Sequence, residues 1–336
     1  MKKLFKYFVF VFVLTFATQL KADHIMGTDI TYRCSSTNDS VFNIILQFYR
    51  DCRGCYVLSQ SPKCGTSEDC NSSGTVPTQL QLSCMTGGSL GNITMKRTAI
   101  VDITKTCKNE KSKCAQPCDG TYPFGIEKHT FEGTIDLRSA MRNGCCRFKI
   151  STTINARSAY ITTGPSGGFS TYLELDACKK PCNTSPQLTN DPVAILCCNQ
   201  PYFFNNGAVD TVNFDSLSYS LVNAFSSPNV KSNYSGSFSG ANPLTAYYPP
   251  GKSYPFNNPN VDPPSGIFID PENGDLIFAP TDCSQQAVVV MQIDEWRKNS
   301  QGVYENVGIT RRDMQFIVQN CPGNNPPKIT NKTYKY

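Results

Sequence analysis

The stretch Val-Phe-Asn-Ile-Ile-Leu-Gln-Phe, residues 41–48, decides the fold class, because an apolar side chain stands at every second position from Phe42 to Phe48. Side chains of a β-strand point alternately to the two faces of a sheet, so a period of two predicts a strand with one face in a hydrophobic core. The same alternation returns in residues 313–318, near the other end of the chain. The sequence therefore predicts strands in both halves of the molecule.

Strand-like composition continues between these two segments, while helical periodicity is scarce. Further strands are expected at residues 148–154, 171–175, 217–222 and 287–293, and one short helical turn at residues 135–141. Asn-Gly dipeptides end at Gly144, Gly207 and Gly274, and such pairs tolerate the positive φ angles of tight turns. The clearest hairpin spans residues 266–279. Together with 22 prolines and 23 glycines, these strands predict an all-β fold with many loops.

The first 22 residues have the pattern of a signal peptide. Basic residues precede an apolar run at residues 7–17, and a polar stretch then ends at Ala22. A membrane-spanning helix needs about 20 apolar residues, which is roughly twice the length of this run. We therefore expect cleavage near Ala22, a secreted or cell-surface mature protein, and no transmembrane span in the mature chain.

Removal of residues 1–22 changes the charge of the protein, because this segment contains four lysines and no acid. The formal net charge falls from +5 to +1, with 27 basic against 26 acidic side chains. A nearly neutral chain lacks the basic footprint that nucleic-acid binding requires. Nucleic acid is therefore not expected as a partner.

All 17 cysteines follow the predicted signal peptide. In an exported chain such density predicts disulfide bonds. The candidates are Cys34, Cys52, Cys55, Cys64, Cys70, Cys84, Cys107, Cys114, Cys118, Cys145, Cys146, Cys178, Cys182, Cys197, Cys198, Cys283 and Cys321. Disulfide geometry favours Cα atoms further apart than one peptide unit allows, so each member of the vicinal pairs 145–146 and 197–198 should bond elsewhere. Because 17 is odd, at least one thiol is expected to stay unpaired or to bond another chain.

Two other uses of cysteine fit the short spacings at residues 52–55, 114–118 and 178–182. Zinc sites contain cysteine pairs at such spacings, but an exported chain with two histidines favours disulfides. A redox-active Cys-x-x-Cys needs a βαβ context, and Cys52 to Cys55 lacks it.

About 314 mature residues predict two domains, with three as the alternative. The cysteine density falls at residues 180–186, a segment bounded by prolines, and we place the boundary there. Residues 23–182 then form a cysteine-rich β domain, residues 183–321 a β-sandwich, and residues 322–336 a linker or tail.

Several short motifs resemble a known family in their order along the chain. They are Asp-His-Ile-Met-Gly-Thr-Asp-Ile-Thr-Tyr-Arg-Cys at 23–34, Leu-Gln-Phe-Tyr-Arg-Asp-Cys at 46–52, Cys-Cys-Arg at 145–147, Thr-Ser-Pro at 184–186, Asn-Gly-Ala-Val-Asp at 206–210, Asp-Ser-Leu-Ser-Tyr-Ser-Leu at 215–221, Asp-Pro-Glu-Asn-Gly-Asp-Leu-Ile-Phe-Ala-Pro-Thr at 270–281 and Arg-Arg-Asp-Met-Gln-Phe-Ile-Val at 311–318. With them the chain resembles the gliding-motility-associated surface proteins of bacteria that export through the type IX route.

The resemblance implies a cysteine-rich N-terminal β domain followed by a cadherin-like or immunoglobulin-like sandwich. Proteins of this family usually continue into further repeats and a C-terminal sorting domain. The segment from Asn324 onward resembles a linker that would open another module.

Motifs of catalysis are few. Gly-Pro-Ser-Gly-Gly at residues 164–168 matches a hydrolase elbow, but that motif needs a strand-to-helix turn and the following residues predict a strand. His24 and His129 are the only imidazoles, and no spacing indicates a pair of catalytic acids. We expect no enzyme and no catalytic residue.

Calcium is the one cofactor that the sequence allows, because cadherin-like modules bind it through carboxylates in loops. The candidate ligands are Asp210, Asp215 and Asp270. The family's usual acidic loop would have a third acid between Asp210 and Asp215, and this chain lacks it. The alternative is that these side chains cap turns.

Residues 223–264 form the longest segment of loop composition, and such loops are uncommon in compact domains unless they serve function or are disordered. Tyrosines among small polar residues are typical of recognition loops. The candidate contact residues are Tyr234, Tyr247, Tyr248, Tyr254 and Phe256. We expect a non-catalytic extracellular surface or adhesion module, linked to gliding motility or surface attachment, whose loop contacts a glycan or protein ligand. The alternatives are that the loop only covers the sandwich, and that the chain is a secreted glycan-binding accessory domain or hydrolase.

Overall fold

The computed structural model describes residues 25–52, 78–106, 109–115, 120–154, 157–158, 160–165, 167–205 and 207–324. Strands take up 51% of the chain and helix 2%, which confirms the expected all-β class. All statements below concern the described residues.

The strands lie in two groups along the chain. The first group contains β1 (Ile25–Cys34), β2 (Val41–Asp51), β3 (Gln79–Cys84), β4 (Gly88–Thr94), β5 (Lys96–Asp102), β6 (Ile126–Asp136), the short helix α2 (Arg138–Arg142), β7 (Arg147–Ile154) and β8 (Phe169–Asp176). The second contains β9 (Gln187–Leu188), β10 (Val193–Cys197), β11 (Tyr202–Asn205), β12 (Ala208–Val209), β13 (Ser216–Val222), β14 (Phe225–Ser227), β15 (Val230–Lys231), β16 (Phe268–Ile269), β17 (Asp275–Phe278), β18 (Gln286–Lys298) and β19 (Tyr304–Gln319).

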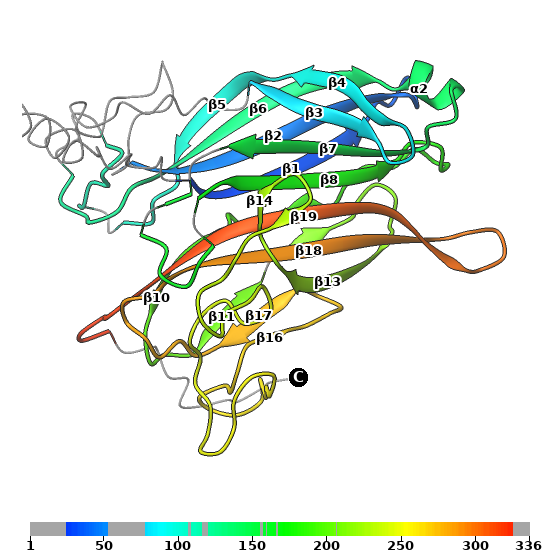
Figure 1. Cartoon of the computed structure of the whole chain (residues 1–336). Coiled ribbons are helices and arrows are strands. Elements are labelled where there is room, and N and C mark those ends of the chain that lie inside the picture. The colour runs from blue at the N-terminus through cyan, green and yellow to red at the C-terminus, as the bar shows by residue number, and fades with distance from the viewer. Residues whose placement is uncertain are drawn as a thin grey trace, which may run out of the picture.

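The first group forms a sandwich of two layers, β4-β3-β7-β8 and β1-β2-β6-β5, which we call the N-terminal sandwich (Figure 1). Its two outermost strands, β4 and β5, are consecutive in sequence and are separated only by Met95, so the chain passes there from one layer to the other. The apolar side chains of β2 at Phe42, Ile44, Leu46 and Phe48 are at most 3% exposed and belong to the core between the layers. The alternation predicted for residues 41–48 is therefore confirmed.

Strand β19 joins the two groups. One of its edges pairs with β18 from Gln286 to Lys298. The other pairs in turn with β8 and β1, both antiparallel, and with β10, which runs parallel to it. Both layers of the N-terminal sandwich therefore meet on a strand that lies near the other end of the described chain (Figure 1). This pairing crosses the boundary predicted near residue 182, and the division into two domains stays a prediction.

A second core lies between β18–β19 and the small sheet β11-β17-β16. Met314, Phe316 and Val318 of β19 point into it and are at most 3% exposed, as the alternation in residues 313–318 predicts. The intervening Asp313 and Gln315 are buried as well, because the opposite face of this sheet is also covered. A hydrophobic sequence period therefore predicts the facing of a strand but not whether its polar face reaches solvent.

The predicted turns are found in part: Gly207, with a φ of 58°, stands between β11 and β12, which pair with different strands. Residues 266–279 form the expected hairpin of β16 and β17, and Gly274 has a φ of 76° there. A Cβ at this glycine would lie 2.6 Å from the ring of Tyr219, so only glycine fits. Gly144, with a φ of 87°, follows the end of α2 instead of connecting two strands.

Six disulfides confirm the prediction of cross-linking. They join Cys34 to Cys182, Cys52 to Cys114, Cys84 to Cys145, Cys146 to Cys178, Cys197 to Cys321 and Cys198 to Cys283. Each member of the two vicinal pairs bonds a distant cysteine, as predicted. Four bonded cysteines, Cys52, Cys114, Cys178 and Cys182, belong to the spacings that also fitted zinc. The remaining candidates, Cys55, Cys64, Cys70, Cys107 and Cys118, lie outside the described residues.

These cross-links have a consequence for location. Disulfides form and persist in oxidising compartments, which places this part of the chain outside a reducing cytoplasm. No helix within the described ranges has the length and apolar character needed to cross a membrane.

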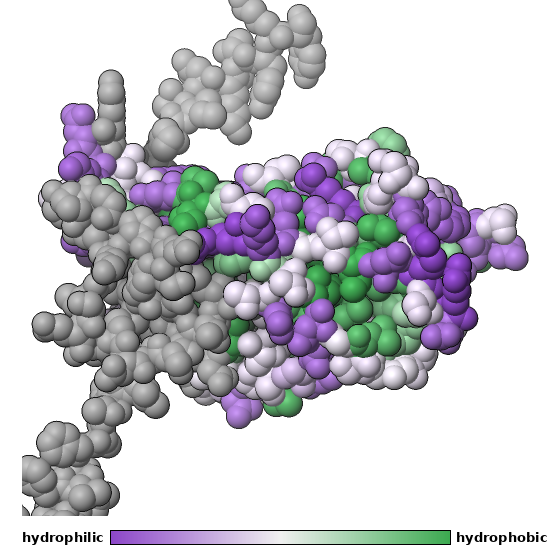
Figure 2. All heavy atoms as spheres, turned by 90° about the horizontal axis from the view of Figure 1, so that it is seen from above, coloured by the Kyte–Doolittle hydropathy of each residue, from purple (hydrophilic) through white to green (hydrophobic). Residues whose placement is uncertain are grey.

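Seen from above, apolar side chains lie in a shallow hollow surrounded by hydrophilic ones (Figure 2).

Candidate ligand-binding site

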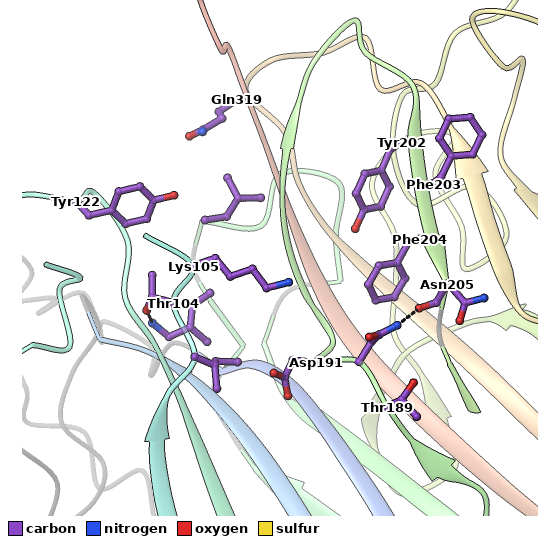
Figure 3. A pocket seen from close by; sticks show the side chains of 14 residues that line it. Thr104, Lys105, Tyr122, Thr189, Asp191, Tyr202, Phe203, Phe204, Asn205 and Gln319 are labelled. Atoms are coloured by element: carbon purple, nitrogen blue, oxygen red, sulfur yellow. Dashed lines mark hydrogen bonds between the residues drawn. The ribbon is translucent and has the colours of Figure 1, made fainter. Parts of the chain in front are cut away.

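A pocket of about 740 Å³ lies between the N-terminal sandwich and the start of the second strand group (Figure 3). Its volume is in the range of roughly 300–1,000 Å³ that is typical of ligand sites. The lining residues are Ile103, Thr104, Lys105, Tyr122, Ile126, Thr189, Asn190, Asp191, Ile195, Tyr202, Phe203, Phe204, Asn205 and Gln319.

Strand β11 forms one wall of the pocket. It pairs only with β17 in the small sheet, so its second edge has no strand partner among the described residues. Tyr202 and Phe204 lie on its inner face, where their rings stack 6.0 Å apart against Phe316 of the second core. Burial raises the pKa of the Tyr202 hydroxyl. Phe203, on the other face, is 65% exposed and forms the outer rim.

A polar segment at residues 189–191 forms the floor. The side-chain amide of Asn190 donates a hydrogen bond to the backbone carbonyl of Asn205 at 2.6 Å, drawn dashed in Figure 3. The hydroxyl of Thr189 donates to the Gly207 carbonyl at 2.8 Å. The carboxylate of Asp191 accepts from the Lys128 ammonium group at 2.9 Å. The floor is therefore fixed to β11, and its one carboxylate is already paired with a lysine.

The opposite wall comes from the N-terminal sandwich. The hydroxyl of Thr104 donates to Asp102 at 2.6 Å and accepts from the backbone N–H of Ile126 at 2.8 Å, which fixes the segment after β5. Tyr122 lies across the pocket from Tyr202, and Lys105 extends from its wall into the space between them (Figure 3).

The chemistry of this lining is that of a binding site. Aromatic rings offer flat apolar surface, while amide and hydroxyl groups provide hydrogen bonds that orient a ligand. Among the lining residues that the structure describes, only Asp191 is a carboxylate, and none is a histidine, serine or cysteine. The pair of acids or the activated nucleophile that hydrolysis needs is not assembled in this lining.

The five candidate contact residues of the long loop differ in how far their rings are buried. Tyr248 packs against the second core, and Tyr234 packs with Ala224, Val288 and Val290, so both rings point inward. Tyr247 is partly exposed. Tyr254 and Phe256 are 47% and 36% exposed. The loop thus covers the core with one part and presents two rings with the other, and ligand contact through it stays a prediction.

The three candidate calcium ligands are not brought together. Asp210 accepts hydrogen bonds from the backbone N–H groups of Val212, Asn213 and Asp215. Asp215 forms an ion pair with Arg297. Asp270 caps the β16–β17 turn by accepting from two backbone N–H groups. Asp210 and Asp270 thus have the bonds of turn caps, which the sequence offered as the alternative, whereas Asp215 forms an ion pair; calcium binding stays a prediction.

The remaining catalytic candidates are placed as follows. His24 and Ser166 lie outside the described residues, and the strand predicted after the Gly-Pro-Ser-Gly-Gly motif is β8. His129 is fully buried, with Nε2 3.1 Å from the Glu127 carboxylate, which also binds Arg50. Burial raises the pKa of Glu127, but the His129 hydrogen bond and the Arg50 charge outweigh it and lower the pKa overall.

One acid with a strongly shifted pKa lies outside the pocket. Burial raises the pKa of Glu295 on β18 to about 8, and nearby Asp210 and Asp215 add to this effect. Its Oε2 accepts from the Asn183 amide at 2.7 Å, whereas its Oε1 has no hydrogen-bond partner among the described residues. Asn183 in turn accepts from Arg297 at 2.6 Å. The side chain is fully buried, so this network links β18 to the segment after Cys182 and is a structural feature.

No protein-family model matches the chain, and no curated protein or solved structure matches it at a significant level. The sequence patterns did not predict the pocket residues as a site. The available signal was the run Tyr202-Phe203-Phe204, because strand alternation leaves one of three consecutive aromatic rings facing solvent. The contribution of residues 103–105 and 122 could not be seen, because only the fold brings them opposite β11.

Proposed function

We propose that the chain is a non-catalytic extracellular module that acts at the cell surface, in adhesion or surface attachment, by holding a glycan or protein ligand in the pocket beside β11. The observation that carries this proposal is the lining of the pocket, which combines aromatic rings and amides with a single, lysine-paired carboxylate. The disulfides support an extracytoplasmic location, and the predicted signal peptide supports export.

The resemblance to gliding-motility-associated surface proteins supports a link to surface movement. Gliding and export through the type IX route belong to the proposal on the strength of these short motifs.

Attachment of coated beads tests the proposal. Beads that carry the mature, oxidised chain are expected to attach to surfaces coated with extracellular polysaccharide or protein, and beads that carry Tyr122→Leu are expected to attach several-fold less. Tyr304→Leu, which removes a 51% exposed ring of β19 that does not line the pocket, is the matched control and should attach as the wild type does. Attachment no stronger than that of uncoated beads contradicts the proposal.

The alternative function is hydrolysis of a glycan, for which Asp191 is the one acid among the described lining residues. Release of reducing ends from polysaccharides by the wild-type chain, lost in Asp191→Asn, is the result that would favour it. We expect no release from either protein, because a hydrolase requires two carboxyl groups about 5–10 Å apart.

A further inference from the structure

We propose that the pocket beside β11 takes an anionic saccharide whose acidic group binds the Lys105 ammonium group. This inference deepens the proposed function and rests on it, since it names the class of ligand for the same site.

The charges of the pocket favour an anion. Asp191 is the only carboxylate of the lining and is paired with Lys128 at 2.9 Å. Lys105 points into the pocket (Figure 3) and forms no ion pair with any residue that the structure describes. Among the described residues, one positive charge therefore remains uncompensated inside the pocket, and it attracts an acidic group.

The shape and polarity of the walls favour a sugar ring. Tyr122 faces Tyr202 and Phe204 across the pocket, so a ligand between the two walls meets aromatic surface on both sides (Figure 3). Such surface suits the apolar faces of a pyranose. Around it stand the amides and hydroxyls of the floor and rim, such as Asn190 and Thr189, which match the hydroxyl groups of a sugar.

An extended peptide added as a strand to the edge of β11 is the competing ligand. Strand addition needs the backbone N–H and C=O groups of the edge. The carbonyl of Asn205 is already taken by the Asn190 side chain, and the chain next to it continues into the pairing of β12 with β9. The edge is thus closed at one end, which favours a saccharide over a strand.

The test combines two proteins with two ligands. Calorimetry at low salt measures binding of hexagalacturonate, which carries carboxylates, and of its fully methyl-esterified form, which has the same rings without charge. Lys105→Gln is expected to weaken hexagalacturonate binding about three- to fivefold, as expected for an exposed ion pair. The same variant should leave binding of the ester unchanged, and high salt should remove the difference.

Two further variants separate charge from rings. Lys231→Gln removes an exposed lysine of β15 that does not line the pocket, and it should bind both ligands as the wild type does. Tyr122→Leu should weaken both ligands about five- to tenfold, because it removes an aromatic wall and keeps apolar volume. Circular dichroism confirms that each variant is folded.

The outcomes distinguish this inference from the proposed function. Equal binding of acid and ester, or equal behaviour of Lys105→Gln and Lys231→Gln, overturns the anionic ligand. If neither saccharide binds while coated beads still attach through the Tyr122 side of the pocket, the ligand is a peptide or protein, and the inference fails although the proposed function stands.

Discussion

The N-terminal sandwich and the region of residues 183–324 share β19 but are cross-linked in different ways. Four disulfides involve residues of the sandwich or its connecting segments, from Cys34–Cys182 to Cys146–Cys178. The second region has two, and both start from the vicinal residues Cys197 and Cys198. The covalent bonds of the second region therefore gather at one end. Away from that end, the stability of the second region depends on its apolar core and on the buried network around Glu295. The two regions should therefore respond differently when a core side chain or a disulfide is removed.

The largest difference is expected from core truncation. Phe316→Ala in the second core should lower the free energy of unfolding by about 3–5 kcal/mol and weaken ligand binding, because Phe316 packs against Tyr202 and Phe204 of the pocket wall. Phe148→Ala, equally buried in the sandwich, should cost similar stability without changing binding. Denaturant unfolding and calorimetry measure both effects. Loss of ligand binding in Phe148→Ala would show that the pocket depends on the core of the sandwich as well as on the second core.

Removal of one disulfide from each region should cost about 2–4 kcal/mol. Cys198–Cys283 closes a loop of 85 residues and Cys146–Cys178 one of 32, so the paired replacement by alanine at 198 and 283 should cost about 1 kcal/mol more than that at 146 and 178. Thermal unfolding of the two double variants shows which of them loses more stability. The opposite order would mean that local packing, and not loop entropy, dominates these bonds.

The pH dependence of stability should reveal the buried acid of the second region. The unfolded state releases the Glu295 proton above pH 4.5, whereas the folded state keeps it up to about pH 8. Stability from this group is thus complete below pH 4.5 and falls as the pH rises towards 8, by about 1.4 kcal/mol per pH unit at most. Glu295→Gln should flatten this decline between pH 5 and 8 in denaturant titrations. Glu272→Gln, at an exposed turn, is the matched control, and an unchanged slope in Glu295→Gln would refute the prediction.

The smallest effect is expected on the exposed part of the long loop. Tyr254→Ser should change the free energy of unfolding by less than about 0.5 kcal/mol, because its ring is half exposed. Tyr248→Ser should cost more, since that ring packs against the second core. Equal costs in thermal unfolding would show that the loop does not divide into a covering part and a presented part.

The sequence predicts strands better than their partners. Alternation in residues 41–48 and 313–318 identifies the faces that enter the two cores, because the period of a strand is a local property. The pairing of β19 with β1, β8 and β10 is not local and leaves no comparable signal. For the same reason cysteine density predicts cross-linking, while the partners, such as Cys34 and Cys182, follow only from the folded chain.

The candidate site was less predictable than the fold. Aromatic residues in loop composition led to residues 223–264, where two of the five rings point inward. The pocket instead combines side chains from segments that are about 100 residues apart in sequence, such as Lys105 and Tyr202. Glu295 also escapes prediction, because a polar residue near the end of an apolar strand usually faces solvent.

The place of β19 has a consequence for the order of folding. This strand follows every other described strand along the chain, yet it covers one edge of β1 and of β8 and is the only described strand that pairs with β10. During synthesis, these earlier strands keep an unpaired edge until residues 304–319 have been added to the chain. Contacts between segments so distant in sequence form slowly. We therefore expect the sheet to be completed only after residues 304–319 have been synthesised.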